Sequence, residues 1–250
     1  MSRLNAWMAG ALAMLSVTCV PASPEAAHSA PPAWCVPPQR DVLQEISGTS
    51  ASPYFVHHPA AAGPAVATVV FLPGGSGSKR SAQRVWDTFL AGGKDVERFR
   101  VVVPYWPDVG MDEDFHRTLP IIDEVLACDG GEPRDVHLAG FSNGGHDAFD
   151  LMLEHPERFA TLLGAPGEFQ LRTTSADLVR LRGKAVFNGI GEKDDEFWHK
   201  GVRDAHEMLL AAGVESVYVE FKGQGHGAAP GFPKDLLFEF WTTHRASMRR

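Results

Sequence analysis

The part of the chain that decides its fold is the stretch at residues 136–145, which reads VHLAGFSNGG. The apolar run Val136–Phe141 predicts a buried strand, and Gly140–Gly144 then has the pattern G-x-S-x-G before a helical stretch. At such a tight strand-to-helix turn the serine backbone is strained, and glycines on either side keep neighbouring side chains from colliding. The turn lifts the Ser142 hydroxyl above the sheet, in front of a helix N-terminus that favours negative charge. An idle serine in a Gly-rich turn is the alternative, but the position between a strand and a helix makes the pattern far more specific.

The rest of the chain alternates apolar, β-branched runs with helical stretches. Most of the runs are apolar on both faces, as the buried strands of a parallel sheet are. Helices are predicted over Leu119–Leu126, Val202–Ala212 and Leu237–His244, where apolar residues share one helical face. The alternation predicts an α/β fold with a mostly parallel sheet and helices on both faces. The other predicted strands are Ala67–Leu72, Val101–Pro104, Thr161–Gly164, Ala185–Ile190 and Val217–Phe221.

Two further segments bear on domain organisation. Leu43–Ile46 and Tyr54–His58 predict a short antiparallel pair at the edge of the sheet. The stretch Glu168–Gly183 is too short for a separate cap domain, and the sequence contains no internal repeat. We therefore expect residues 31–250 to form a single domain, which is an ordinary length for an α/β fold.

A serine hydroxyl needs a base before it can act as a nucleophile. Ligands of open α/β sheets bind beyond the carboxyl ends of the strands, and Gly223–Gly227, GQGHG, follows the last predicted strand. We predict that His226, flanked by glycines on this loop, is the general base. His146 is the rival, but it follows the serine within the predicted helix and would point badly. The histidines on strand ends and helices are expected at the surface: His57, His58, His155, His199, His206 and His244.

The third residue of a catalytic triad is a carboxylate that orients the histidine and stabilises its charged form. Where the serine lies in a G-x-S-x-G turn, the chain order is serine, acid, histidine. The acid should therefore follow the strand that ends at Ile190, where Asp194 and Asp195 are both candidates. We favour Asp194, three residues after Gly191, and expect the other acidic residues of this run to be solvated.

The oxyanion of an acyl-transfer reaction needs two hydrogen-bond donors. One is the backbone N–H of Asn143, the residue after the nucleophile, and the other should come from the loop after the first core strand. In that loop we favour Gly75, with Ser76 as the second choice. A nucleotide-binding loop at Gly74–Lys79 is disfavoured, because a serine stands where the P-loop pattern requires its second glycine.

Composition and the first residues bear on where the protein acts. The formal net charge of −8 argues against a nucleic-acid partner, which requires a basic surface. Residues 1–30 combine Arg3 with an apolar run at 7–20 and predict a signal peptide and tether, with a retained membrane anchor as the alternative. We expect a secreted or periplasmic protein, free of the membrane after cleavage. Cys35 and Cys128 then form a disulfide or remain free thiols, and without a C-x-x-C pair no structural zinc site is expected.

Together these residues resemble the α/β-hydrolase superfamily. The similarity is nearest to small secreted serine esterases of the dienelactone hydrolase, polyhydroxybutyrate depolymerase and feruloyl esterase type, over nearly all of the mature chain. It rests on Ala139–Gly145, His155–Ala160, Gly191–Asp194 and Gly225–Gly227. The resemblance implies hydrolysis of carboxylic esters through an acyl-enzyme, with no metal or organic cofactor. The chain departs from many relatives at Pro73, where they have a histidine, and this departure bears on the second oxyanion donor.

Two other functions remain open on this sequence. A serine peptidase or a thioesterase uses the same acyl-transfer machinery, so the motifs do not separate either from an esterase. A non-catalytic binding protein is the other alternative, against which the complete set of serine, aspartate and histidine argues. The expected partner is a small-molecule or polymeric ester. Four aromatic residues after strands are candidates for an acyl pocket, with simple packing as the alternative: Tyr105, Trp106, Phe197 and Trp198.

The loops predicted around Ser142 carry more carboxylates than cationic side chains. Such a field repels anions over a Debye length of about 8 Å at physiological salt. We therefore expect neutral or cationic esters to be preferred over esters with a carboxylate near the scissile bond. The residues concerned are Asp108, Asp112, Glu113, Asp114, Asp195 and Glu196, against Lys79, Arg80 and Lys193.

Overall fold

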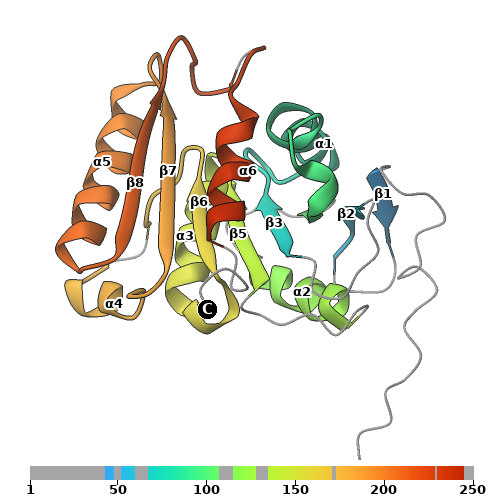
Figure 1. Ribbon diagram of the computed structural model, residues 1–250, viewed down its shortest axis with the longest axis horizontal. Helices are drawn as coiled ribbons and strands as arrows, with labels where there is room; N and C mark the ends of the chain where they lie inside the picture. Colours follow the sequence, from blue (N-terminus) through green and yellow to red (C-terminus); the bar gives the residue numbers. More distant parts are fainter. Residues whose placement is uncertain are drawn as a thin grey trace, which may run out of the picture. The chain divides into compact units, whose positions relative to one another are not determined.

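An eight-stranded sheet with the order β1-β2-β4-β3-β5-β6-β7-β8 organises the protein (Figure 1). The computed structural model describes residues 43–47, 52–59, 67–106, 115–127, 135–170, 173–228 and 230–244. β1 pairs antiparallel with β2, β2 pairs antiparallel with β4, and all other neighbours are parallel. The strands are β1 Leu43–Ile46, β2 Tyr54–His57, β3 Thr68–Leu72, β4 Arg100–Pro104, β5 Val136–Gly140, β6 Thr161–Gly164, β7 Ala185–Gly191 and β8 Glu215–Phe221.

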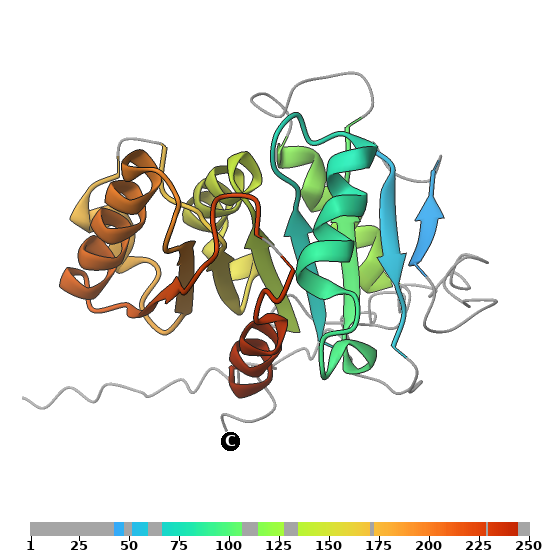
Figure 2. The ribbon, with the colours of Figure 1, turned by 90° about the horizontal axis from the view of Figure 1, so that it is seen from above.

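The helices cover both faces of this sheet (Figure 2). One face carries α2 (Thr118–Ala127), α3 (Asn143–Glu154) and α5 (Glu196–Ala211), together with the short α4 (Ser175–Val179). The opposite face carries α1 (Lys79–Val85), the π-helical turn Trp86–Leu90 that continues it, and α6 (Lys234–Thr243). The predicted α/β architecture is therefore confirmed, including the antiparallel pair at one edge.

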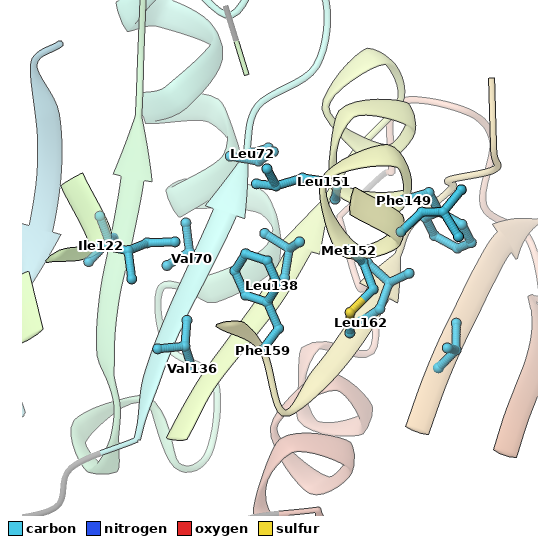
Figure 3. Packing of buried hydrophobic residues seen from close by; sticks show 14 of the residues in the cluster. Val70, Leu72, Ile122, Val136, Leu138, Phe149, Leu151, Met152, Phe159 and Leu162 are labelled. Atoms are coloured by element: carbon cyan, nitrogen blue, oxygen red, sulfur yellow. The ribbon is translucent and has the colours of Figure 1, made fainter. Parts of the chain in front are cut away.

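Alternating side chains of the central strands supply the two cores. In β3, Val69 and Phe71 pack against α1 and α6, whereas Val70 and Leu72 pack against α2 and α3. Figure 3 shows the second of these cores, where Phe149 and Met152 of α3 lie over the strands. Because every residue of β3, β4 and β5 is buried, their β-branched and apolar sequences follow from burial on both faces.

Three histidines expected at the surface are buried, and that expectation was wrong for His57, His58 and His199. His57 lies on β2, which is paired on both sides, and its ring packs 4.9 Å from the ring of Trp86. His199 lies on α5 one residue after Trp198, on the side of that helix that faces the sheet. A position at a strand end or on a helix therefore does not predict that a histidine is exposed, because a neighbouring element can cover it.

Several sequence-based predictions fall outside the described residues. These are the signal peptide over residues 1–30, the pairing of Cys35 with Cys128, and the acidic stretch at 108–114. All three stay predictions. Of the helices that the structure describes, none combines the length and the apolar character needed to cross a membrane.

Candidate active site

The turn between β5 and α3 holds Ser142 in an unusual backbone conformation. Its φ is 58° and its ψ is −124°, a combination that residues other than glycine rarely adopt. A Cβ on Gly140 would lie 1.9 Å from the Gly144 carbonyl oxygen, and one on Gly144 would lie 2.3 Å from the Leu72 carbonyl oxygen. A Cβ on Gly145 would lie 2.1 Å from the Pro166 carbonyl oxygen. These glycines are therefore required because backbone from β3, from the loop after β6 and from the start of α3 converges on this turn.

Backbone hydrogen bonds fix the turn to the strands on either side. The Ser142 N–H donates to the Pro166 carbonyl at 3.0 Å, and the Phe141 N–H donates to the Leu72 carbonyl at 3.2 Å. The loop after β6 is in turn held by Asn188 of β7, whose side-chain amide exchanges two hydrogen bonds with the Gly167 backbone. The position of the Ser142 hydroxyl is thus set by β3, β5, β6 and β7 together.

The structure brings Ser142, His226 and Asp194 into one hydrogen-bonded series. The Ser142 Oγ lies 2.9 Å from His226 Nε2, and His226 Nδ1 lies 3.0 Å from both carboxylate oxygens of Asp194. The Asp194 side chain is 0% exposed, whereas the His226 side chain is 38% exposed. Because an ionised carboxylate only accepts, Nδ1 of His226 donates to Asp194 and leaves Nε2 to accept from the serine hydroxyl.

The two candidate acids occupy different places. The loop carrying Asp194 is bound to the histidine loop by backbone, since the Lys193 N–H donates to the Gln224 carbonyl at 2.8 Å. Asp195 instead caps α5, accepting from the Trp198 N–H at 3.1 Å. The structure therefore places Asp194 against His226 and gives Asp195 a role in starting the helix.

His146 contacts other groups. Its Nδ1 lies 3.2 Å from the Glu168 carbonyl oxygen, and its ring stacks on Trp198 at 4.6 Å. Burial lowers the pKa of His146, which favours the neutral form of the ring. Trp198 also packs against the ring of His226, with ring centroids 5.0 Å apart. His146 therefore supports the packing around His226, and it is His226 that contacts the Ser142 hydroxyl.

A hydrogen bond joins the two residues that are predicted to supply the oxyanion donors, Asn143 and Gly75. Asn143 is the first residue of α3, so its backbone N–H has no carbonyl partner within the helix. Its side-chain amide donates to the Gly75 carbonyl at 3.1 Å, which joins the loop after β3 to the start of α3. Gly75 has a φ of +64°, and a Cβ there would meet only Ser81 Oγ, at 3.7 Å. Conformation, rather than crowding, is what favours glycine at this position.

A small pocket adjoins this arrangement. It has a volume of about 70 Å³ and lies between the loop after β3, α1 and the histidine loop. Its aromatic wall was not predicted from sequence patterns, and none of the four aromatic residues proposed for an acyl pocket lines it. Tyr105 and Trp106 are buried, and Phe197 is 65% exposed. The lining residues are Gly74, Gly75, Ser81, Arg84, Val85, Thr88, Phe89, Phe141 and Gly227.

Solved structures of esterases share this fold. The chain matches a thermostable esterase at 18% identity with a TM-score of 0.63, covering 81% of this chain and 62% of that one. A fungal esterase from Rhizomucor miehei matches at 14% identity and a TM-score of 0.63, covering 84% of this chain and 85% of that one. Esterase 2 of Thermogutta terrifontis, phosphonylated by cyclosarin, matches at 15% identity and a TM-score of 0.61, covering 83% and 96%.

Neither protein-family models nor curated protein sequences give a match to the chain. The structural similarity therefore carries the comparison, and at these identities it shows the fold. The chain has the α/β-hydrolase fold of esterases, which confirms the resemblance at that level. The narrower similarity to dienelactone hydrolases, polyhydroxybutyrate depolymerases and feruloyl esterases stays a prediction.

Proposed function

We propose that this chain is a serine hydrolase that cleaves carboxylic esters through an acyl-enzyme. Ser142 is the nucleophile, His226 the general base and Asp194 the residue that orients it. The observation that carries the proposal is the hydrogen-bonded series from the Ser142 hydroxyl through His226 to the buried Asp194 carboxylate. The series lies at the carboxyl ends of parallel strands, where open α/β sheets bind ligands.

In this mechanism Nε2 of His226 takes the proton of the Ser142 hydroxyl as the oxygen attacks the ester carbonyl carbon. The negative charge that develops on the carbonyl oxygen is stabilised by the N–H of Asn143 and, we propose, by that of Gly75. The carbon–oxygen bond to the alcohol then breaks, and His226 returns its proton to the leaving alcohol. Water, activated by the same histidine, attacks the acyl-enzyme and releases the acid.

An esterase is favoured over the other functions by two observations. The three solved structures compared above are those of esterases, which makes ester hydrolysis the first choice over peptide or thioester hydrolysis. Against a purely binding role, Ser142 keeps a strained backbone, and strain of this kind is found mainly at functional sites. Residues 1–30 support the further proposal that the protein acts outside the cytoplasm.

The size of the pocket beside the site favours ester substrates with a short acyl group, which would bind in this pocket. Its volume of about 70 Å³ favours a short acyl group over a long chain. Phe89 and Phe141 contribute apolar wall, with ring centroids 5.2 Å apart, and Arg84 is the one cationic side chain among the described residues of the lining. The site itself remains open enough at His226 for the alcohol part to extend into solvent.

Replacing the nucleophile tests the proposal most simply. Ser142→Ala should lower kcat/KM for p-nitrophenyl acetate by roughly three orders of magnitude or more, because the residues of a triad act as a unit. The variant should keep the wild-type circular dichroism spectrum and unfolding midpoint. Substantial turnover by the folded variant would exclude Ser142 as the nucleophile.

The neighbouring aspartates separate a catalytic from a structural role. Asp194→Asn should lower kcat by about 10⁴, because the imidazole loses the partner that fixes its tautomer. Asp195→Ala should keep most of the activity but lower the free energy of unfolding by about 1 kcal/mol, because α5 loses its N-cap. Kinetics and urea unfolding of both variants provide the measurement. A larger loss of activity in Asp195→Ala would transfer the orienting role to Asp195.

The Arg84 side chain should affect substrates that carry a charge. Arg84→Gln should lower the ratio of kcat/KM for a carboxylate-bearing acyl ester to that for its neutral analogue by about 2- to 5-fold at low salt, as expected for an exposed charge. Lys79→Gln is the matched control, since Lys79 pairs with Glu45 and does not line the pocket. An unchanged ratio would show that the pocket is not the acyl site. The wild-type ratio tests the separate expectation, drawn from the acidic residues, that neutral or cationic esters are preferred.

A further inference from the structure

A second group of chemically reactive side chains lies at the end of α3 remote from Ser142. It consists of His116, in the 3-10 turn Phe115–Arg117, with Glu154 and His155 at the C-terminus of α3. The His116 Nε2 lies 2.6 Å from Glu154 Oε2, and the same oxygen lies 3.9 Å from His155 Nε2. One ligand atom from each residue lies within 4.8 Å of the others.

Imidazole nitrogen and carboxylate oxygen are typical ligands of zinc. With metal–ligand bonds of about 2.0–2.2 Å, the ligand atoms of a tetrahedral site stand roughly 3.3 Å apart. The separations here bracket that value. Because His116 is exposed and Glu154 and His155 are half-buried, small side-chain rotations that leave the core untouched would bring all three onto one ion.

The surroundings of both histidines suit metal binding. A carboxylate that accepts from the second ring nitrogen is the usual support for a histidine ligand, and Glu157 lies near that position: its carboxylate oxygen is 3.7 Å from Nδ1 of His155, which is beyond hydrogen-bond distance. His116 stacks on Phe115 with ring centroids 4.2 Å apart, which restricts the orientation of its ring. The C-terminal end of α3 also carries the negative end of the helix dipole, which favours a cation. Arg180 opposes this, because its guanidinium donates to the Glu154 carbonyl at 3.4 Å.

We propose that His116, Glu154 and His155 form a three-ligand surface site for zinc or a similar divalent cation, with water completing the coordination. The cluster is separate from the proposed catalytic site, since α3 has 12 residues and spans about 18 Å between them. The ion ties the segment that leads into α2 to the end of α3. Its role is to stabilise that junction, and the hydrolytic reaction does not need it.

The proposal is tested with zinc chloride alone on the full chain, freed of metal with EDTA. Isothermal titration should find one zinc ion bound per chain at this site, and the unfolding midpoint should rise with zinc concentration, because the ion binds the folded state. His116→Ala and His155→Ala should each weaken binding by about 100-fold or more, since loss even of a supporting partner costs 10–100-fold. Their unfolding midpoints without zinc should stay near that of the wild type.

His206→Ala is the control, because His206 lies on α5 and contacts Ser216 and Tyr218. It should bind zinc as the wild type does. The proposal is overturned if zinc does not bind the wild-type chain up to millimolar concentration. It is equally overturned if the two alanine variants in the cluster bind zinc with unchanged affinity and stoichiometry.

Discussion

The backbone of Ser142 has a φ of 58° and a ψ of −124°, a conformation that residues other than glycine rarely adopt. Such a conformation costs on the order of 1–3 kcal/mol and persists only if its surroundings determine it. The surroundings are the carbonyl groups of Leu72 and Pro166 and the glycines that let them approach. The strain places the hydroxyl at the start of α3 and at the edge of the sheet, within reach of loops that follow other strands.

The loops that carry Asp194 and His226 are also fixed by close backbone contacts. A Cβ on Gly191 would lie 2.7 Å from both the Gln224 and Gly225 carbonyl oxygens, so the acid and histidine loops pack backbone against backbone. The Gly223 N–H also donates to the Glu192 side chain at 2.7 Å. Because these contacts set the position of His226 before any substrate binds, little reorganisation is required when charge develops on its ring. The short distances that join Ser142 to His226 and His226 to Asp194 are therefore a property of the fold.

Sequence patterns predicted the sheet, and they named the three residues that the structure brings together, for identifiable reasons. Buried parallel strands must be apolar on both faces, and a strained serine turn requires its glycines, so β3 to β7 and Ser142 leave strong signals. Patterns left both Asp194 and Asp195 as candidates for the acid, because the choice depends on which residue caps α5. The pocket wall at Arg84 and Phe89 was missed because α1 is a single short helix continued by a π turn. His116 and His155 are distant in the chain, and only the fold brings them together.

The central claim is that His226 activates Ser142, and covalent labelling of the serine measures that activation directly. The wild-type chain, treated with a fluorophosphonate and digested, should carry one adduct, on the peptide containing Ser142. His226→Ala should react slower by at least roughly 10³-fold, because the hydroxyl has lost its base. A folded wild-type chain that is not labelled, or a His226→Ala variant that is labelled equally fast, would contradict the account.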